Sequence, residues 1–487
     1  MSSDHDVRED RYAVDTGFAL PDLVPLAGDG GRVDLESDQL ESSYFDTEEH
    51  DLLRRGVTLR RQVGGSGAKW ELTEATGSTA TELPADPRAS IGGVPPELAT
   101  LSTGLRRGRP LRRTALVRTA RVTYRVIDGG GRVLVALVDD RMHAVAPGSE
   151  KALFADWREI AVEAGGHPDE RAAAKSVLLG AGAKRTTGAS AIARALDLVP
   201  ESSGSKRPTK TAGETIQRFL AEQDEALLAG DLALRQGQDA IHPTRVATRR
   251  LRSTLRVFAD YVDPVRAAHL DAELSWLAGL LGAVRDPDVQ RARLVKAVAE
   301  VPDDLVVGPV LARIERHLQE EKSTRQAALN SAMSSRRYAK LLRETADWST
   351  SPPFTPKAAK KAGALQTAVE SAAKKVTKSL RKGLRTGDED ELHRARKAGK
   401  RARYAAELAH RVLGKRVRKS ITRYQHLQDI LGEHQDSMVA ADLLRSIALT
   451  TTGIPGENGF TFGLLHAAEH RNAKRSRAKA NTWVSAF

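Results

Sequence analysis

The sequence predicts a multidomain α+β protein with a β-rich first half and an all-helical second half. The first half has runs of alternating apolar and polar residues, rich in Val, Thr and Tyr and separated by Gly and Asp turns, a pattern typical of strands. The second half has apolar residues at helical spacing. Between them, PESSGSKRPTKTA has the composition of a linker. We therefore predict domains at residues 1–199 and 213–487, joined by a linker at 200–212.

The strand pattern is clearest at 57–63, 116–128, 131–145 and 157–164, and DGGG at 128–131 is a strong hairpin signal. Charged residues such as Arg118 and Arg121 occupy strand positions. A barrel with a charged interior would explain them, and so would a sheet with one solvated face. Residues 168–196 change to a helical pattern, which Gly180 and Gly182 interrupt. From about 213 onward we predict helices, with breaks at the following places: Pro243, Pro264, Pro287, Pro302, 351–356, 387–390 and 451–459.

Charge is distributed unevenly over the 487 residues, whose net charge is +13. The first 200 residues contain 26 Lys and Arg against 30 Asp and Glu, and the remainder contains 50 against 33. A basic half of this kind indicates a polyanionic partner. Aromatic residues make up only 4% of the chain, which argues against single-stranded nucleic acid, where bases stack on aromatic rings.

Cysteine is absent, so the sequence offers neither a disulfide framework nor a thiolate metal site, and we expect a reducing cytoplasm. The polar N-terminal segment does not have the pattern of a signal peptide. No stretch of 18 apolar residues is present, and we therefore expect no membrane partner.

A row of basic residues dominates the helical half. Its members are spaced 3, 4, 3 and 4 residues apart, which places all of them on one side of a helix. They are His242, Arg245, Arg249, Arg252 and Arg256. Like charges in one row repel each other, so an anion lying on the row would relieve that cost. The simpler alternative is a solvated helix face without a ligand.

The row is repeated 151 residues later as His393, Arg396, Lys400 and Arg403. The segments LGAVRDPDV (281–289) and LGEHQDSMV (431–439) also match, at an offset of 150. Two matches separated by nearly the same number of residues indicate an internal duplication, with copies at about 213–350 and 357–487. Glu407 stands where Arg256 would be repeated, so the second row is weaker. We expect both histidines at helix starts, where free backbone N–H groups favour anions.

Residues 213–487 resemble the CHAD domain. The matching segments are IHPTRVATRRLRSTLRVF, LGAVRDPDV, SSRRYAKLL, LHRARKAGKRARYAAEL and LQDILGEHQDS. The resemblance implies an all-α domain of two pseudo-symmetric four-helix bundles. It also implies that inorganic polyphosphate binds to the basic, histidine-bearing face formed by the two rows.

The first half resembles the CYTH domain, through segments such as SYFDTEEHDLLRRGVTLRRQVGG, VRTARVTYRV, VDDRMHAV and WREIAVE. This resemblance implies an antiparallel β-barrel of the triphosphate tunnel type. In that family carboxylates hold a divalent metal ion while Arg and Lys bind the triphosphate. The positions of this chain that correspond to such a site are Glu9, Arg11, Arg60, Arg118, Arg121, Asp140, Glu159 and Glu163.

Four positions depart from the family's pattern. Val7 and Ala161 stand in place of carboxylates, and Thr73 and Ala191 stand in place of lysines. The losses remove charge that should hold metal and phosphate, so we predict a barrel with little or no hydrolytic power, in which Mg²⁺ or Mn²⁺ would matter only if activity is retained.

Our leading hypothesis is a cytoplasmic polyphosphate-binding protein, for which association with polyphosphate granules is plausible. Its histidines would make binding tighten as the pH falls through the imidazole pKa. One alternative is a metal-dependent triphosphatase or polyphosphate hydrolase in the barrel. Another is a nucleic-acid binder, which the scarcity of aromatic residues disfavours. A fourth, weaker hypothesis makes the degenerate barrel a protein-interaction module.

Overall fold

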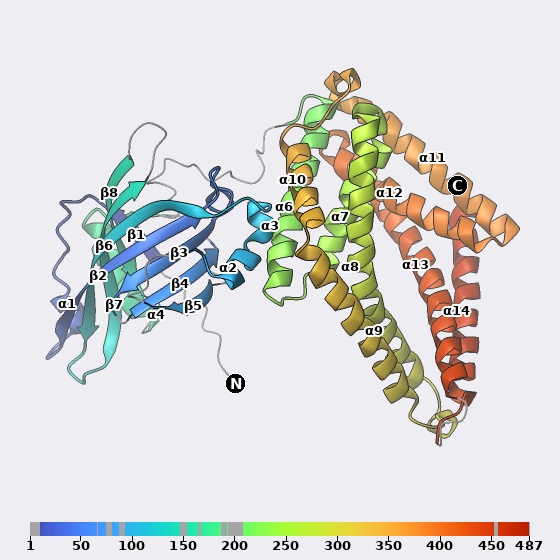
Figure 1. Cartoon of the computed structure of the whole chain (residues 1–487), viewed down its shortest axis with the longest axis horizontal. Helices are drawn as coiled ribbons and strands as arrows, with labels where there is room; N and C mark the ends of the chain where they lie inside the picture. Colours follow the sequence, from blue (N-terminus) through green and yellow to red (C-terminus); the bar gives the residue numbers. More distant parts are fainter. Residues whose placement is uncertain are drawn as a thin grey trace. The chain divides into compact units, whose positions relative to one another are not determined.

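A computed structural model describes residues 10–65, 67–74, 80–86, 93–146, 153–163, 167–186, 192, 208–451 and 456–486. The chain divides into two compact units, Met1–Ser202 and Ser203–Phe487. Strands occur in the first unit, and the second unit is built from long helices (Figure 1).

The strands of the first unit form one antiparallel sheet in the order β5-β4-β3-β2-β6-β7-β8-β1-β9. They are β1 Asp10–Val14, β2 Arg32–Asp46, β3 Val57–Gly64, β4 Gly67–Glu74, β5 Ala80–Ala85, β6 Arg112–Ile127, β7 Val133–Ala146, β8 Leu153–Val162 and β9 Lys184–Arg185. The predicted antiparallel β fold is confirmed. Within the described residues, β5 and β9 are the edges of the sheet, and no pairing between them closes a ring.

The two faces of this sheet differ in polarity. One face carries Tyr12, Leu137 and Ile160, which form an apolar cluster with residues of two helices, α1 (Val24–Ala27) and α4 (Pro168–Gly180). Successive side chains of a strand point to opposite faces. Asp140 and Glu159, which are paired in register on β7 and β8, therefore point away from this cluster.

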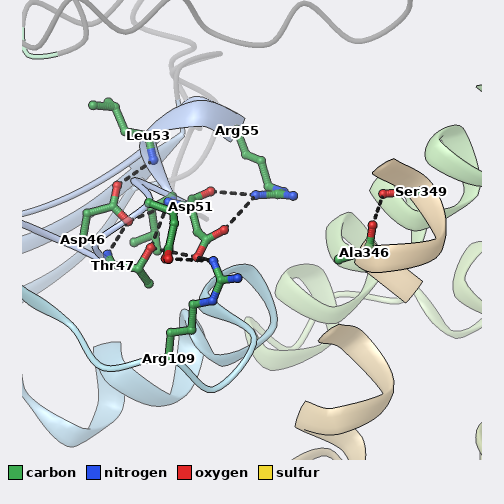
Figure 2. Close-up of polar contacts among 10 residues, drawn as sticks. Asp46, Thr47, Asp51, Leu53, Arg55, Arg109, Ala346 and Ser349 are labelled. Atoms are coloured by element: carbon green, nitrogen blue, oxygen red, sulfur yellow. Dashed lines mark hydrogen bonds and ion pairs between the residues drawn. The ribbon is translucent and has the colours of Figure 1, made fainter. Parts of the chain in front are cut away.

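A buried carboxylate organises the turn that follows β2 (Figure 2). Asp46 accepts hydrogen bonds from the backbone N–H groups of Thr47, Leu52 and Leu53, at 2.7, 3.0 and 2.9 Å. Burial raises the pKa of Asp46 to about 6, although these three donors oppose the shift. Asp51 completes the turn by accepting from the Thr47 hydroxyl at 2.7 Å and pairing with Arg109 at 2.9 Å. The 3-10 helix η1 (Leu53–Arg55), α2 (Pro96–Leu101) and α3 (Thr103–Arg106) complete the elements of this unit.

The helical pattern predicted at 168–196 is interrupted at its glycines, as expected. α4 ends at Gly180, and Gly182 then adopts a positive φ of 95° that turns the chain. The following residues form β9, which pairs with Tyr12 and Ala13 of β1. Sheet pairing therefore follows this interruption. Ile192 is helical, and residues 187–191 and 193–196 lie outside the described part of the chain.

The second unit contains the helices α6 Ala212–Arg235, α7 Ile241–Val257, α8 Pro264–Ala299, α9 Val310–Met333, α10 Arg336–Thr350, α11 Leu365–Thr386, α12 Glu389–Leu413, α13 Lys415–Thr450 and α14 Phe460–Ser485. Short 3-10 helices lie between them: η2 Ala259–Tyr261, η3 Asp303–Leu305, η4 Pro356–Ala359 and η5 Ala362–Ala364. The predicted all-helical half is confirmed. None of the helices in the described part of the chain is both long enough and apolar enough to span a membrane.

Local sequence explains most of the helix boundaries. Asp263 caps α8 by accepting from the backbone N–H of Arg266 at 2.8 Å, and Pro264 is its first residue. Pro243 lies in the first turn of α7, as predicted. The predicted break at Pro287 is wrong, because this residue lies inside the continuous helix α8. An interior proline removes one backbone hydrogen bond, and the buried residues on either side keep the helix packed.

The segments that echo each other in the sequence lie in two helix pairs, α7–α8 and α12–α13. α8 and α13 each have 36 residues and contain the two matching LG segments. Figure 1 shows α8 with α9, and α13 with α14, as two long pairs. One apolar cluster joins these four helices near Leu294, Ile314, Leu444 and Phe462, while another is formed by α11–α14.

Candidate functional site

Helices α7 and α12 bring the two predicted basic rows together. A cleft of about 430 Å³ lies where the rows meet, and every described residue that lines it is basic or neutral. Eight lysines and arginines line it, more than any other residue type. The lining residues are Arg245, Arg249, Arg252, Ser253, Arg256, Ser275, His393, Arg396, Lys397, Lys400, Arg401 and Tyr404. The duplicated rows therefore form one site.

Glu407 links the two helices. Its Oε2 atom accepts from Nε and Nη2 of Arg250 in α7, at 3.1 and 2.8 Å. The sequence comparison marked Glu407 as the place where the second row loses its last basic residue. The loss has a structural role, because a carboxylate at this position ties α12 to α7 beside the cleft.

Three arginines of the first row already have acidic partners. Arg245 pairs with Asp286 at 3.1 Å. Arg252 and Arg256 share Asp271 of α8, at 3.2 and 2.6 Å. Their charge is partly neutralised before any ligand arrives, so we expect each to contribute less to anion binding than an uncompensated arginine.

The other cations of the cleft lack such partners. Within the described residues, Arg249, Arg396 and Lys400 make no ion pair, and the buried Nε atoms of Arg249 and Arg396 have no hydrogen-bond partner. Burial, together with the charges of Arg396, Arg249 and Arg245, lowers the pKa of Lys400 to about 7. The negative charge of Asp436 opposes the lowering of the pKa of Arg396 and Lys400, although Asp436 forms no ion pair with either in the described part of the chain. A group of partly buried cations without ion-pair partners is costly to the free protein, and an anion in the cleft would reduce that cost.

The histidines occupy different positions. His242 is the second residue of α7, as predicted, and is exposed beside the cleft. The prediction that His393 lies at a helix start is wrong, because α12 begins at Glu389, with Asp388 as its cap. Nδ1 of His393 lies 3.0 Å from Oε1 of Gln435. Desolvation first, and then neighbouring cations, lower the pKa of both imidazoles.

Arg403 belongs to the predicted row but does not line the cleft. Its Nη1 atom donates to Gln425 of α13, and its Nε atom lies 3.5 Å from Glu407. Conversely, the cleft includes Lys397 and Arg401, which the row prediction missed. They lie four residues after His393 and Lys397, so extending the search to that spacing on the same helix face would have found both.

In the first unit, two arginines of the predicted triphosphate site, Arg60 and Arg121, are neutralised by acids. Arg121 makes a bidentate pair with Asp140, with both distances 2.7 Å. Arg60 Nε donates to Glu71 Oε2 at 2.5 Å. Glu159 is buried next to Asp140 in register. These residues share the face that points away from the apolar cluster.

Not all of the predicted residues join them. Arg118 is three residues before Arg121 on the same strand, so its side chain points to the opposite face, where it lies 3.4 Å from Glu41. Arg11 lies opposite Ala161, and Glu163 is exposed just beyond the end of β8. Glu9 lies outside the described residues. In the part of the chain that is described, no three His, Asp or Glu side chains gather as a metal ion would require.

Comparison with known proteins places the helical unit in a family. The model of the CHAD domain matches residues 218–445. The uncharacterized protein Rv2226 of Mycobacterium tuberculosis is 30% identical over 480 residues, which cover 90% of this chain and 88% of that protein. Among solved structures, the CHAD domain from the plant Ricinus communis is 24% identical, covers 58% of this chain and 98% of that chain, and has a TM-score of 0.45.

A putative adenylyl cyclase from Hippeastrum, whose title reports a dominant triphosphatase activity, is 15% identical and covers 40% of this chain and 96% of that chain, with a TM-score of 0.25. The family match leads to one conclusion. The chain contains a CHAD domain, which spans residues 218–445.

Proposed function

We propose that the cleft between α7 and α12 binds inorganic polyphosphate. The observation that carries this proposal is that three cations without acidic partners, Arg249, Arg396 and Lys400, line one cleft from two helices. The remaining lining arginines and His393 would extend the contact, and His242 would meet the polymer at the edge of the cleft. A protein that binds the polymer in this way would also be retained on polyphosphate granules.

The shape and chemistry of the cleft favour a thin, flexible polyanion. Cations that follow each other along a helix are about 5 Å apart per turn, so successive ones can contact successive units of one chain. A guanidinium presents a planar fork of donors, which suits phosphate oxygens. Each internal unit of polyphosphate carries a negative charge and has no base or sugar to accommodate. A rigid duplex would bring its phosphates to the rim but not to the partly buried Arg396 and Lys400.

A competition experiment tests this proposal against nucleic-acid binding. Labelled long-chain polyphosphate is bound to the whole protein and then challenged with duplex DNA, RNA or unlabelled polyphosphate at equal phosphate concentration. We expect only unlabelled polyphosphate to displace the label efficiently. Displacement by DNA or RNA at the same phosphate concentration would replace polyphosphate with nucleic acid as the ligand. Binding should also weaken steeply with salt, because it depends on charge.

The alternative of a triphosphatase in the β unit is favoured less by the geometry. Arg121 and Arg60, which would have to bind the triphosphate, are already held by Asp140 and Glu71. We therefore expect no release of phosphate from tripolyphosphate above background with Mg²⁺ or Mn²⁺. Robust turnover that disappears in Glu159→Ala would instead establish the hydrolase.

A further inference from the structure

The last long helix carries two histidines whose imidazole rings meet. His466 and His470 are four residues apart in α14, so they lie one turn apart on one side of the helix. Their Nε2 atoms are 3.2 Å apart, and their ring centroids are 4.5 Å apart. The pair lies beyond residues 218–445, which match the family model, and does not line the basic cleft. The proposed function makes no use of it.

We infer that His466 and His470 form a binding site for a late first-row divalent metal ion, such as Zn²⁺, Ni²⁺ or Cu²⁺. Neutral imidazole nitrogen is a preferred ligand of these ions, and two histidines at positions i and i+4 of a helix can bind one ion together. The proposal assigns one Nε2 atom of each ring as a ligand. It is independent of polyphosphate binding.

The separation of the two nitrogens fits such an ion. Zinc–nitrogen bonds in proteins are about 2.0–2.1 Å long. Two bonds of that length whose nitrogens are 3.2 Å apart enclose an angle of about 100° at the metal, between the octahedral and tetrahedral values. The rings would therefore need little movement to bind. Both residues are only partly buried.

The neighbouring carboxylate does not complete the site. Glu469 is buried and accepts from Nε and Nη2 of Arg293, at 3.0 and 2.6 Å. No cluster of three or more His, Asp or Glu side chains suited to a metal occurs among the described residues. The ion would thus have two protein ligands, with water in the remaining positions. Acid should release it, because protonated imidazole cannot ligate.

The competing explanation is a hydrogen bond between the rings without any metal, and titration of the whole protein with Ni²⁺ or Zn²⁺ separates the two. The titration is followed by calorimetry at pH 7.5 in a phosphate-free buffer. We compare the unchanged protein with His466→Ala and His470→Ala, and with His426→Ala as the control, because His426 is a single exposed histidine of α13.

We expect binding of one ion, weakened about tenfold or more in either site variant and unchanged in the control. Equal affinity in the unchanged protein and the site variants would overturn the inference. If the variants fail to fold, the electron paramagnetic resonance spectrum of Cu²⁺ on the unchanged protein decides. Hyperfine coupling to two imidazole nitrogens supports the site, and coupling to one or none contradicts it.

Discussion

The two units of this protein both gather arginines, yet they differ in how the charge is compensated. On the sheet, Arg121 is matched by Asp140, Arg60 by Glu71, and the buried Arg158 by Asp139 at 2.8 and 2.7 Å. In the helical cleft, Arg249, Arg396 and Lys400 have no such partner among the described residues. An arginine that must break a bidentate pair before it binds phosphate gains little from the exchange. The number of basic residues therefore predicts an anion site less well than the absence of acids paired directly with them.

The largest effect should follow removal of an uncompensated arginine. We expect Arg249→Ala or Arg396→Ala to weaken polyphosphate binding about 10- to 100-fold each, since a charge-assisted hydrogen bond is typically worth about 1.5–3 kcal/mol. Fluorescence anisotropy with labelled polyphosphate measures the change. Arg337→Ala is the matched control, because Arg337 lies outside the cleft and pairs with Glu273 at 2.7 Å. A similar loss in the control would show that net charge alone drives binding.

The next effect is a pH dependence that Lys400 creates. Its pKa is about 7 in the free protein, and a bound anion raises it. Below pH 7 the amine is already charged, so affinity should change little through this group. Above pH 7, binding must take up a proton, so affinity should fall by up to about tenfold per pH unit until the pKa of the bound state is reached.

Binding isotherms between pH 7 and 9 measure this slope. His242 and His393 stay neutral in this pH range, because their pKa values are lowered. Lys400→Arg is the control, because arginine keeps its charge throughout and should flatten the curve. An equally steep slope in that variant would remove Lys400 from the contact.

A smaller effect should go in the opposite direction. Asp271 holds Arg252 and Arg256, so Asp271→Asn frees both for the ligand. We expect polyphosphate affinity to rise about two- to fivefold, the range of partly exposed ion pairs. Equilibrium titration with polyphosphate at low salt is sensitive enough to detect a rise of this size. Unchanged or weaker binding would mean that the carboxylate orients the two arginines rather than competing with the ligand.

The smallest effect should come from the sheet. Because its arginines are compensated by Glu71 and Asp140, Arg60→Ala and Arg121→Ala should leave the affinity of the whole protein for polyphosphate unchanged. A polyphosphate-binding isotherm for each variant measures this affinity. A clear loss in either variant would locate part of the binding in the β unit and would erase the contrast between the units.

Sequence periodicity was sufficient to predict much of this architecture and most of the residues that line the cleft. The spacing predicted that the nine proposed side chains would form one row on each of two helices, and seven of the nine line the cleft. Spacing could not show that Arg403 would bond to Gln425 of α13, because that contact depends on tertiary packing. Spacing also could not predict that Asp271 would pair with Arg252 and Arg256, since Asp271 comes from a different helix.

Strand parity gives a second lesson. Arg118 and Arg121 both match the resemblance, yet an odd spacing places them on opposite faces of β6. The pairing of β9 with β1 after α4 and the continuity of α8 through Pro287 also depended on packing. In each case a local preference was outweighed by partners distant in the sequence.

The most direct test compares two variants that lose the same charge. One carries Ala at Arg245, Arg249, Arg396 and Lys400, all of which line the cleft. The other carries Ala at Arg337, Lys357, Lys382 and Arg411, which pair with acids outside it. With long-chain polyphosphate, we predict that the first variant loses binding while the second retains nearly all of it. Binding in the first variant as strong as in the second would contradict the assignment of the cleft as the polyphosphate site.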